Sequence, residues 1–464
     1  MRRFTLTCFV ALFFVTLVVP AAFSDYVERQ LTFGTDVNHS LDNNLNWSPD
    51  CQWIAYDTRA FEGGINNTLT LEKVNINTRD IIVIYKAPNA LPLDKFGPGT
   101  AAVSFFPFED KVIAIRGING VQYAGTARFG AMISPTDGSV GPEGYIIADA
   151  RDVTPPFTPG ALRGGTHRHE PTGDGKFVGF TYNDQVMAGL SKDLRTIGMT
   201  KLGIPVKVDT ALGNQNGVGF TVLIVKVKPK DEITPGSDDI YQGSEDSWVG
   251  ERGYKKADGT WQRARAFIGK TLSSAGTELT EVFIADVPED ITVAGPDGPL
   301  QGTETTFPMP PAGTVQRRLT HSTTGCGGII RCSLDGSRIA FTRDNQIWLV
   351  SPLGGEPTQA TSIPTGAARP WWDPSGNYLY CVSDNSLWMT NVKVGDPNFG
   401  QSVRLTDPNL YPNNAPDATC VSPDGNWVAF NRQFDRGDGV KVKQIFITPG
   451  ARQLSEVVDW SQLK

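Results

Sequence analysis

A short cassette recurs along this chain and strongly restricts the folds open to it. Each copy has an apolar approach, then Ser-Pro-Asp-Gly or a near copy, then a strand-like run with an aromatic residue near its end. One copy cannot bury its own apolar face, so several must stand side by side around a common core. The copies read WSPDCQWIAY (47–56), TGDGKFVGF (172–180), SLDGSRIAF (333–341), DPSGNYLYC (373–381) and SPDGNWVAF (422–430).

The residues of the cassette predict a tight turn followed by a buried strand. Pro presets φ at the first turn position, Asp bonds its own backbone, and Gly supplies the positive φ that closes the turn. The β-branched and aromatic residues that follow are typical of a strand between stacked sheets. One copy departs from this pattern, because Cys51 stands where the others carry Gly. We therefore expect a strained turn, or one of another type, at Cys51.

A second element, Arg-Leu-Thr or a relative, repeats between the cassettes. The steps from Thr320 to Thr361, Thr406 and Ser455 are 41, 45 and 49 residues. This period is close to the roughly 40 to 45 residues of a four-stranded propeller blade. The sequence thus predicts an all-β propeller of four-stranded antiparallel blades. The element occurs as RQLT (29–32), RRLT (317–320), TQAT (358–361), RLT (404–406) and RQLS (452–455).

Counting these units predicts seven blades in a single closed domain, residues 25–464. A degenerate blade begins at Val103, and another joins Val218 to later strands (263–272 and 278–287) across a polar insertion at about 228–262. The N-terminal RQLT is expected to supply the outer strand of the last blade and close the ring. The C-terminal RQLS competes for that place. The clearest blades are 46–85, 168–208, 330–361, 373–406 and 420–455.

The first residues have the features of a secretory signal peptide. Arg2 and Arg3 precede an apolar run from Phe9 to Val19, and small residues follow up to Ser24, after which we expect cleavage. A membrane anchor needs about 20 apolar residues, more than this run contains. The sequence thus predicts a periplasmic or secreted protein, residues 25–464, with no membrane span in the mature chain and a monomeric state.

Charge and cysteine content narrow the classes of partner and chemistry. A net charge of −7 with mixed signs argues against nucleic acid as a partner, because phosphate recognition usually leaves a basic stripe. Five cysteines remain after Ser24, so at least one thiol is free, and a bridge between Cys326 and Cys332 is left open. The chain contains neither a Gly-x-Ser-x-Gly elbow before a helix nor a phosphate-binding glycine loop.

Longer segments resemble known propellers. The RQLT and WSPDG pattern resembles the TolB-type repeat, and the chain is more similar to the YidR-like family of exported bacterial proteins, a domain of unknown function. The resemblance implies a seven-bladed propeller outside the cytoplasm with no established catalytic residues. The segments that carry it are NWSPDCQWIAYDTR (46–59), DARDVTPPFTPGALRGGTHRHE (149–170) and GSDDIYQGSEDSWVG (236–250).

The four histidines suggest a metal site. In TolB-like blades the segment before each turn lines the central channel, and His39, His167, His169 and His321 all fall in such segments. Alternate residues of a strand share a face, so His167 and His169 are expected to point the same way. With His39 or His321 they could hold Zn²⁺ or Mn²⁺. The alternative is that they are hydrogen-bonded channel residues.

Acidic residues in the polar insertion raise the possibility of Ca²⁺. Seven of them lie between Lys228 and Lys256, although no twelve-residue calcium-loop spacing is present. A solvated flap is the alternative interpretation of this segment. Within it, Tyr241 and Trp248 could stack on a sugar face.

Charged residues are also expected at the channel mouth. Arg and Asp side chains suit recognition of a carboxylate or hydroxyl group on a sugar or peptide. An internal salt-bridge network that holds a long loop is the alternative. The candidates are Asp57, Arg59, Arg151, Asp152, Arg163 and Glu170.

Two functions therefore remain open. One is a binding or scaffold module that recognises an envelope protein or glycan at the channel mouth. The other is a metal-assisted lyase or hydrolase that acts on an acidic polysaccharide, by analogy with oligogalacturonate lyases, which use a histidine-bound metal in a related propeller. Fold analogy alone is a weak argument for function. The first is favoured because no complete set of catalytic groups can be named.

Overall fold

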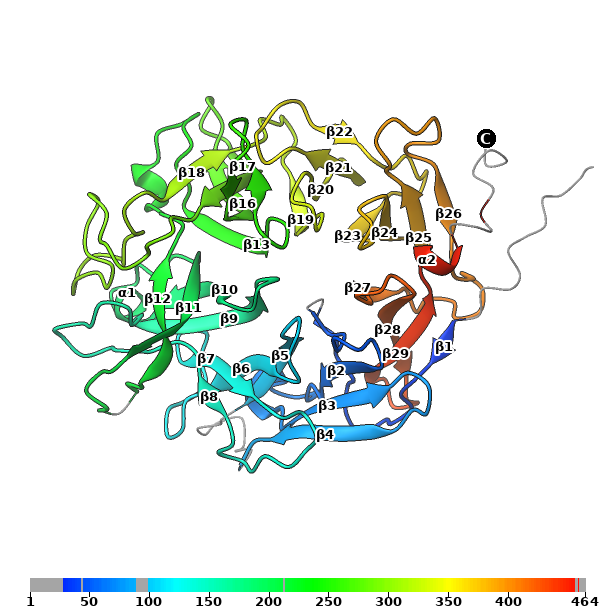
Figure 1. Cartoon of the computed structure of the whole chain (residues 1–464), viewed down its shortest axis with the longest axis horizontal. Coiled ribbons are helices and arrows are strands. Elements are labelled where there is room, and N and C mark those ends of the chain that lie inside the picture. The colour runs from blue at the N-terminus through cyan, green and yellow to red at the C-terminus, as the bar shows by residue number, and fades with distance from the viewer. Residues whose placement is uncertain (1–27, 43–44, 89–98, 212, 455–457, 459–464) are drawn as a thin grey trace, which may run out of the picture.

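The structure is a ring of seven β-sheets around a central axis, in the computed structural model drawn in Figure 1. It describes residues 28–42, 45–88, 99–211, 213–454 and 458. The predicted signal peptide lies outside these residues. Among them, no helix has the length and apolar character needed to cross a membrane. The predicted all-β propeller with seven blades is confirmed.

The first three blades follow one another along the chain, each running from the channel outward. Blade 1 consists of β2 (Trp53–Asp57), β3 (Thr70–Asn75) and β4 (Ile81–Lys86), with the 3-10 helix η1 (Gly64–Asn67) between the first two. Ser40 and Trp47 form isolated β-bridges to β2 from its channel side. Blade 2 consists of β5 (Thr100–Phe105), β6 (Val112–Gly117), β7 (Arg128–Ile133) and β8 (Ile146–Ile147). Blade 3 consists of β9 (Gly164–Pro171), β10 (Phe177–Asp184), β11 (Thr196–Val206) and β12 (Gly217–Leu223), with helix α1 (Gln185–Gly189) after β10.

Blades 4 to 6 repeat this order. Blade 4 consists of β13 (Gln242–Trp248), β16 (Ala264–Leu272), β17 (Glu278–Asp286) and β18 (Val315–Arg318); helix η2 (Lys230–Glu232) precedes it, and the hairpin of β14 (Tyr254–Lys255) and β15 (Trp261–Gln262) interrupts it. Blade 5 consists of β19 (Gly327–Cys332), β20 (Ile339–Arg343), β21 (Gln346–Val350) and β22 (Thr358–Gln359). Blade 6 consists of β23 (Ala368–Trp372), β24 (Tyr378–Ser383), β25 (Ser386–Asn391) and β26 (Ser402–Arg404).

Blade 7 joins the two ends of the chain, as predicted. It consists of β27 (Asp417–Val421), β28 (Trp427–Asp435), β29 (Lys441–Pro449) and the N-terminal β1 (Arg29–Gln30). Arg29 pairs with Ile447 and Gln30 with Phe446. The competing C-terminal segment is not a strand there, since α2 (Ala451–Leu454) forms instead. The N-terminal RQLT therefore closes the ring.

The boundary between blades 3 and 4 differs from the prediction. The strand around Val218 was assigned to blade 4, but β12 pairs with β11 as the outer strand of blade 3. Part of the predicted polar insertion, β13, is the channel strand of blade 4 and pairs with β16. The acidic and polar composition of β13 concealed it, because this strand faces the channel rather than a dry core. The assignment of the whole 228–262 segment as an insertion was therefore wrong.

The turn cassette is held by the side chains that the sequence repeats. In blade 7, Ser422 Oγ donates to Asp424 Oδ1 at 2.6 Å and accepts from the backbone N–H of Trp427 at 2.9 Å. The same pair of bonds occurs at Ser48 and Ser333. Cys51 has a φ of 59°, where Gly425 has 72°, so the predicted strained turn at Cys51 is confirmed.

The threonine of the Arg-Leu-Thr element accepts a backbone hydrogen bond at the point where the outer strand separates from the third strand. In blade 7, Thr32 Oγ1 accepts the backbone N–H of Ile445 at 2.9 Å. Thr320, Thr361 and Thr406 accept a third-strand N–H in the same way, each at 2.9 Å. A buried N–H left without a partner would be costly, which explains why a hydroxyl stands at this position.

A β-bulge interrupts the channel strand of each of blades 2 to 7. The register shifts there, and one residue of each bulge has a positive φ. In five of these blades that residue is not glycine, and in blades 3, 6 and 7 it lies four positions before the cassette. The residues are Ala102, Arg168, Glu245, Gly328, Arg369 and Ala418.

Candidate functional site

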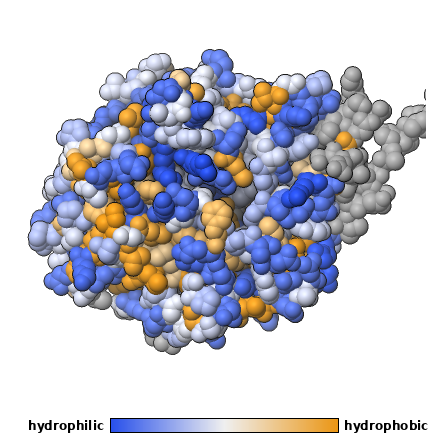
Figure 2. Space-filling view, in the orientation of Figure 1, coloured by the Kyte–Doolittle hydropathy of each residue, from blue (hydrophilic) through white to orange (hydrophobic). Residues whose placement is uncertain are grey.

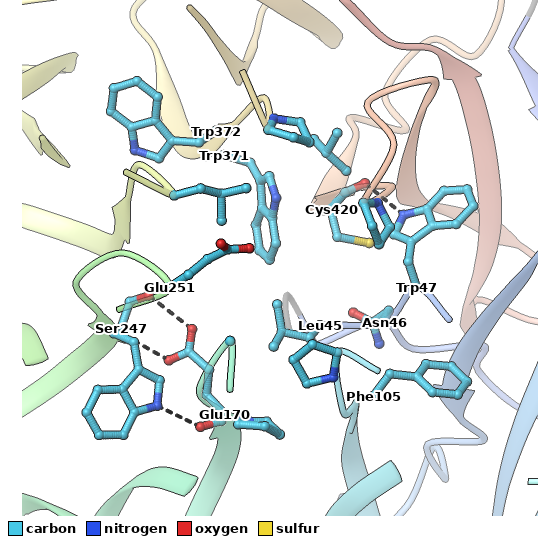
Figure 3. Close-up of a pocket in the computed structure, with 18 of the residues that line it drawn as sticks. Leu45, Asn46, Trp47, Phe105, Glu170, Ser247, Glu251, Trp371, Trp372 and Cys420 are labelled. Carbon is cyan, nitrogen blue, oxygen red and sulfur yellow. Dashed lines mark hydrogen bonds between the residues drawn. The ribbon is translucent and has the colours of Figure 1, made fainter. Parts of the chain in front are cut away.

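The channel strands end at a shared depression, which we call the funnel. It has a volume of about 280 Å³, and side chains from all seven blades line it. In Figure 3, Leu45, Glu251 and Trp371 point toward its middle from three different blades. The lining residues used below are Leu45, Trp47, Phe105, Phe108, Glu170, Ser247, Trp248, Glu251, Arg331, Cys332, Leu334, Trp371, Trp372 and Cys420.

The wall and rim of the funnel are mainly apolar. Trp371 is half-buried, while Leu334 and Phe108 are 43% and 79% exposed. Four turn prolines also line it: Pro49, Pro107, Pro374 and Pro423. These prolines occupy the second position of their turns, so the same residues that make the corners also make the rim. Such an apolar, solvent-open surface is typical of a binding site.

Glu170 is the acidic group in the wall, and neighbouring blade 4 holds it in place. Its carboxylate accepts hydrogen bonds from Ser247 Oγ at 3.0 Å and from the backbone N–H of Trp248 at 3.3 Å. Arg265 lies 3.1 Å from it and also pairs with the buried Asp246. The side chain of Glu170 is 20% exposed, so one edge of the carboxylate reaches the funnel.

Arg331 supplies a buried cation beside Trp371 in the aromatic wall. Its guanidinium lies over the ring of Trp371, 4.3 Å from the ring centre. Its backbone carbonyl accepts the indole N–H of Trp372 at 2.9 Å. Burial, with the nearby Arg168, lowers the pKa of Arg331 to about 9. Burial raises the pKa of the adjacent Cys332 thiol, so this cysteine is not an activated nucleophile.

Two of the predicted mouth residues, Asp57 and Arg59, bind each other. Arg59 Nε and Nη2 each lie 2.9 Å from a carboxylate oxygen of Asp57, and Arg59 also pairs with Asp42. Asp57 in addition accepts the backbone N–H of Ala102, the bulge residue of blade 2, at 3.0 Å. The group thus ties blade 1 to blade 2, and neither residue lines the funnel.

Three more predicted mouth residues hold loops of blades 3 and 4. Arg163 pairs with Asp184 at 2.9 Å, with both side chains fully buried. Arg151 is buried and donates to backbone carbonyls, among them that of Gly164 at 3.0 Å. Asp152 accepts the backbone N–H of Thr158 at 3.0 Å. This is the geometry of an internal network, the alternative that the sequence left open, and of the six candidates only Glu170 lines the funnel.

The structure does not bring the four histidines together. His39 is buried near Lys443 in blade 7, and His321 is exposed after β18. His167 and His169 are both on β9, but Arg168 between them is the bulge residue, so the expected alternation is broken and the prediction that they share a face was wrong. Among the described residues, no three His, Cys, Asp or Glu side chains are grouped to hold a metal ion.

The candidate disulfide bridge and the two aromatic residues proposed to stack on a sugar can also be checked in the structure. Cys326 and Cys332 are both free thiols, so the bridge left open between them does not form. Tyr241 donates to the exposed Glu278 at 3.0 Å, away from the funnel. Trp248 does line the funnel, but its indole N–H donates to the carbonyl of Glu170 at 2.8 Å.

The sequence argument missed most of the funnel residues, although a signal for them was present. Several of them are the two residues immediately before a turn cassette, such as Arg331-Cys332 and Trp371-Trp372. Aligning the cassettes and comparing these two columns would have identified the wall. Of the four histidines, only His167 and His169 lie on a channel strand, further along β9 from the funnel.

Comparisons with known proteins extend over most of the chain. Residues 99–214 match a family described as a protein of unknown function (DUF3748). The chain is 36% identical over 436 residues to the uncharacterized protein YidR of Escherichia coli, covering 89% of this chain and 96% of YidR. The crystal structure of the polysaccharide lyase Uly1 is similar with a TM-score of 0.47 at 10% identity, over 93% of this chain and 94% of that one. A protein of Agrobacterium tumefaciens assigned provisionally as TolB has a TM-score of 0.37 at 15% identity, over 82% and 98%.

Proposed function

The chain belongs to the YidR family, whose function is unknown, and we propose that it is a binding module that holds an apolar segment of a protein partner in the funnel. One observation carries this proposal: all seven blades contribute side chains to a single solvent-open depression, and most of those side chains are apolar. The fold does not need an exposed apolar surface at the ends of its channel strands. Leaving it open to water is a cost that a ligand would remove.

The size of the funnel indicates how much of a partner it can hold. Its volume of about 280 Å³ lies just below the ~300 to 1,000 Å³ typical of ligand pockets. This suits one or two large side chains of an extended segment. Trp371 would be the central contact, since it is aromatic, half-buried and directed into the funnel (Figure 3).

The polar groups of the funnel favour a protein segment over a glycan. A sugar presents many hydroxyl groups, each of which needs a hydrogen-bonding partner once it is buried. The carboxylate of Glu170 already accepts bonds from Ser247 and Trp248. An apolar segment needs few new hydrogen-bonding partners when it is buried. Glu170 and Glu251 carry negative charge at the funnel and would suit a cationic residue of the partner next to that segment.

The site of action that we propose is outside the cytoplasm, with the mature chain working as a monomer. The support for export is the segment from Arg2 to Ser24, with its charged start and apolar run. N-terminal sequencing of protein recovered from the periplasm or medium tests this, and a first residue of Asp25 is expected. Recovery of the unprocessed chain in the cytoplasm would contradict it.

A displayed library of random peptides tests the binding function. We expect the mature chain to select peptides rich in aromatic and aliphatic residues. Synthetic copies should bind Trp371→Ala at least about tenfold more weakly, because truncating a central aromatic anchor commonly costs more than about 1 kcal/mol. Trp261→Ala is the matched control, since Trp261 is 52% exposed on the β14–β15 hairpin and lies outside the funnel. The proposal would be overturned if the peptides bound Trp371→Ala as tightly as they bind the wild type. It would also be overturned if binding that depends on Trp371 were found only on a glycan array.

A further inference from the structure

A cluster of basic side chains lies further along β9 from the funnel. Gly130 of β7 faces β9, because a Cβ atom built there would stand 2.8 Å from His169 Nε2. Arg128 lies two residues earlier on the same face of β7. Its Nη2 lies near Gly125, whose carbonyl oxygen would stand 2.3 Å from a Cβ atom built on Gly165 of β9, and its charge acts on both His167 and His169.

Arg195 reaches the same place from the third strand of blade 3. Its Nη2 donates to Thr181 Oγ1 at 2.8 Å. Thr181 pairs in register with His167, and its hydroxyl donates to the His167 carbonyl at 3.4 Å. The bulge residue Arg168 adds a further cation at the edge, 4.0 Å from Glu245 of blade 4.

The inner groups of this cluster lack the partners that buried cations normally have. Arg128 is only 7% exposed, yet among the described residues its guanidinium makes one hydrogen bond, to the Tyr123 hydroxyl at 3.3 Å. The Nε atoms of Arg128 and Arg195 and Nδ1 of His167 are buried, and no described residue gives them a hydrogen-bonding partner.

The nearest carboxylates are engaged elsewhere. Glu245 pairs with Arg168, and Asp246 pairs with Arg265. Asp193 accepts from Asn183 and from the backbone N–H of Asp184. Neither Arg128 nor Arg195 has a carboxylate within 4.0 Å in the part of the chain that the structure describes.

Three other buried arginines of this protein are balanced by carboxylates, while Arg116 and Arg151 donate several hydrogen bonds to uncharged oxygens, in contrast to the single hydrogen bond of Arg128. Arg163, Arg265 and Arg432 each pair with a buried or half-buried carboxylate. Burial of an unpaired charge is expensive. Burial, followed by the neighbouring Arg128, lowers the pKa of both His167 and Arg195, as expected where like charges lie close together.

We propose that Arg128, Arg195 and His167, with Arg168 at the edge, form a binding site for a single oxyanion group: a carboxylate, phosphate or sulfate. Guanidinium groups are suited to such ions, because planar N–H donors match the oxygens of the anion. Water reaches the cluster, since the side chains of Arg168 and Glu245 are 16% and 47% exposed. The site goes beyond the proposed function, because it lies apart from the funnel and its ligand is charged rather than apolar.

Thermal unfolding and calorimetry of the mature protein test this site. Chloride is replaced at constant ionic strength by inorganic phosphate, sulfate or acetate, and these three arms distinguish the kinds of oxyanion. We expect at least one of them to raise Tm with increasing concentration. The variants Arg128→Gln and Arg195→Gln should weaken its binding by about tenfold or more, through loss of charge-assisted hydrogen bonds. Arg252→Gln, at an exposed position, is the matched control and should bind as the wild type does.

Stability without added oxyanion separates a binding role from a structural one. Removal of an unpaired buried charge should leave Tm in chloride unchanged or higher in Arg128→Gln and Arg195→Gln. A structural arginine would instead lower it. If none of the three anions shifts Tm, or if the two variants are destabilised in chloride and keep the full response to the anion, the proposal is overturned. Should Arg128→Gln fail to fold, the half-buried Arg195 alone decides, with Arg195→Lys expected to retain part of the binding.

Discussion

The indole N–H of Trp47 donates to the backbone carbonyl of Cys420 at 3.3 Å, across 373 residues of sequence. This bond joins the first blade to the last on the channel side, whereas β1 joins them at the outer edge. Two tryptophans at the ends of other channel strands do the same: Trp248 bonds to Glu170 and Trp372 to Arg331, at 2.8 and 2.9 Å. A tryptophan before the turn thus connects its own blade to the preceding one.

Replacement of one of these tryptophans should weaken the ring by a measurable amount. Trp372→Phe retains much of the apolar surface but removes the indole N–H that donates to the buried carbonyl of Arg331. We expect a loss of about 1 kcal/mol in the free energy of unfolding, measured by chemical denaturation. Trp261→Phe, on the exposed hairpin, should change it far less. Equal stability of Trp372→Phe and the wild type would show that the bond contributes nothing.

The strained turn at Cys51 predicts a stabilising substitution. Its φ of 59° is unfavourable for a residue with a Cβ atom, so Cys51→Gly should raise the free energy of unfolding by about 1 kcal/mol. The reciprocal control is Gly425→Ala, at the equivalent turn position in blade 7. That change should destabilise by a similar amount, because φ there is 72°. A destabilised Cys51→Gly would mean that packing of the thiol outweighs the strain.

His169 predicts a specific dependence of stability on pH. Burial, with a contribution from Arg128, lowers the pKa of this imidazole to about 3, whereas the unfolded chain titrates near ~6.5. Below about pH 6.5 the unfolded state therefore binds a proton that the native state does not, so stability falls as pH falls toward 3. Asp149 acts in the opposite direction, because burial raises its pKa to about 6.

The variant His169→Gln isolates this effect, since Asp149 is common to both proteins. The stability of the wild type relative to His169→Gln should decrease as the pH is lowered from 7 to 4.5. Unfolding curves at half-unit pH steps would measure it. His321→Gln, at an exposed position, should give a curve parallel to that of the wild type. Parallel curves for His169→Gln as well would exclude a lowered pKa.

The Asp57–Arg59 pair predicts a large and one-sided cost. Arg59→Met leaves Asp57 fully buried without its cation, which should cost about 3 kcal/mol in the free energy of unfolding. Arg404→Met breaks an exposed pair with Asp384 and should cost less than about 1 kcal/mol. Similar losses in the two variants, measured by denaturant unfolding, would contradict a structural role for Arg59.

Local chemistry made much of this fold predictable. Pro49, Asp50 and their equivalents specify a turn by their own backbone preferences, and the threonines of Arg-Leu-Thr serve one N–H each. These signals need only neighbouring residues or an adjacent strand. Their regular spacing was enough for the blade number, whereas the choice of the N-terminal over the C-terminal segment to close the ring needed the strand pairing in the structure.

The boundary between blades 3 and 4 could not be predicted in this way. Strand β13 is polar because it borders the channel, so its composition resembles that of a loop. Strand β12 is apolar and precedes it, which made it look like the start of the next blade. Only the pairing of β12 with β11 assigns it, and strand pairing depends on residues that are far apart in sequence.

The sequence by itself determined the turns, the repeat and the seven blades, and it left two segments as candidates for closing the ring. Only the tertiary structure decided which side chains meet at the channel. The bulge at Arg168 turns His167 and His169 apart, and the convergence of seven strand ends creates the funnel around Trp371. The physical reason is that turn preferences reside in a few consecutive residues, whereas a bulge or a shared cavity depends on how separate strands and blades pack together.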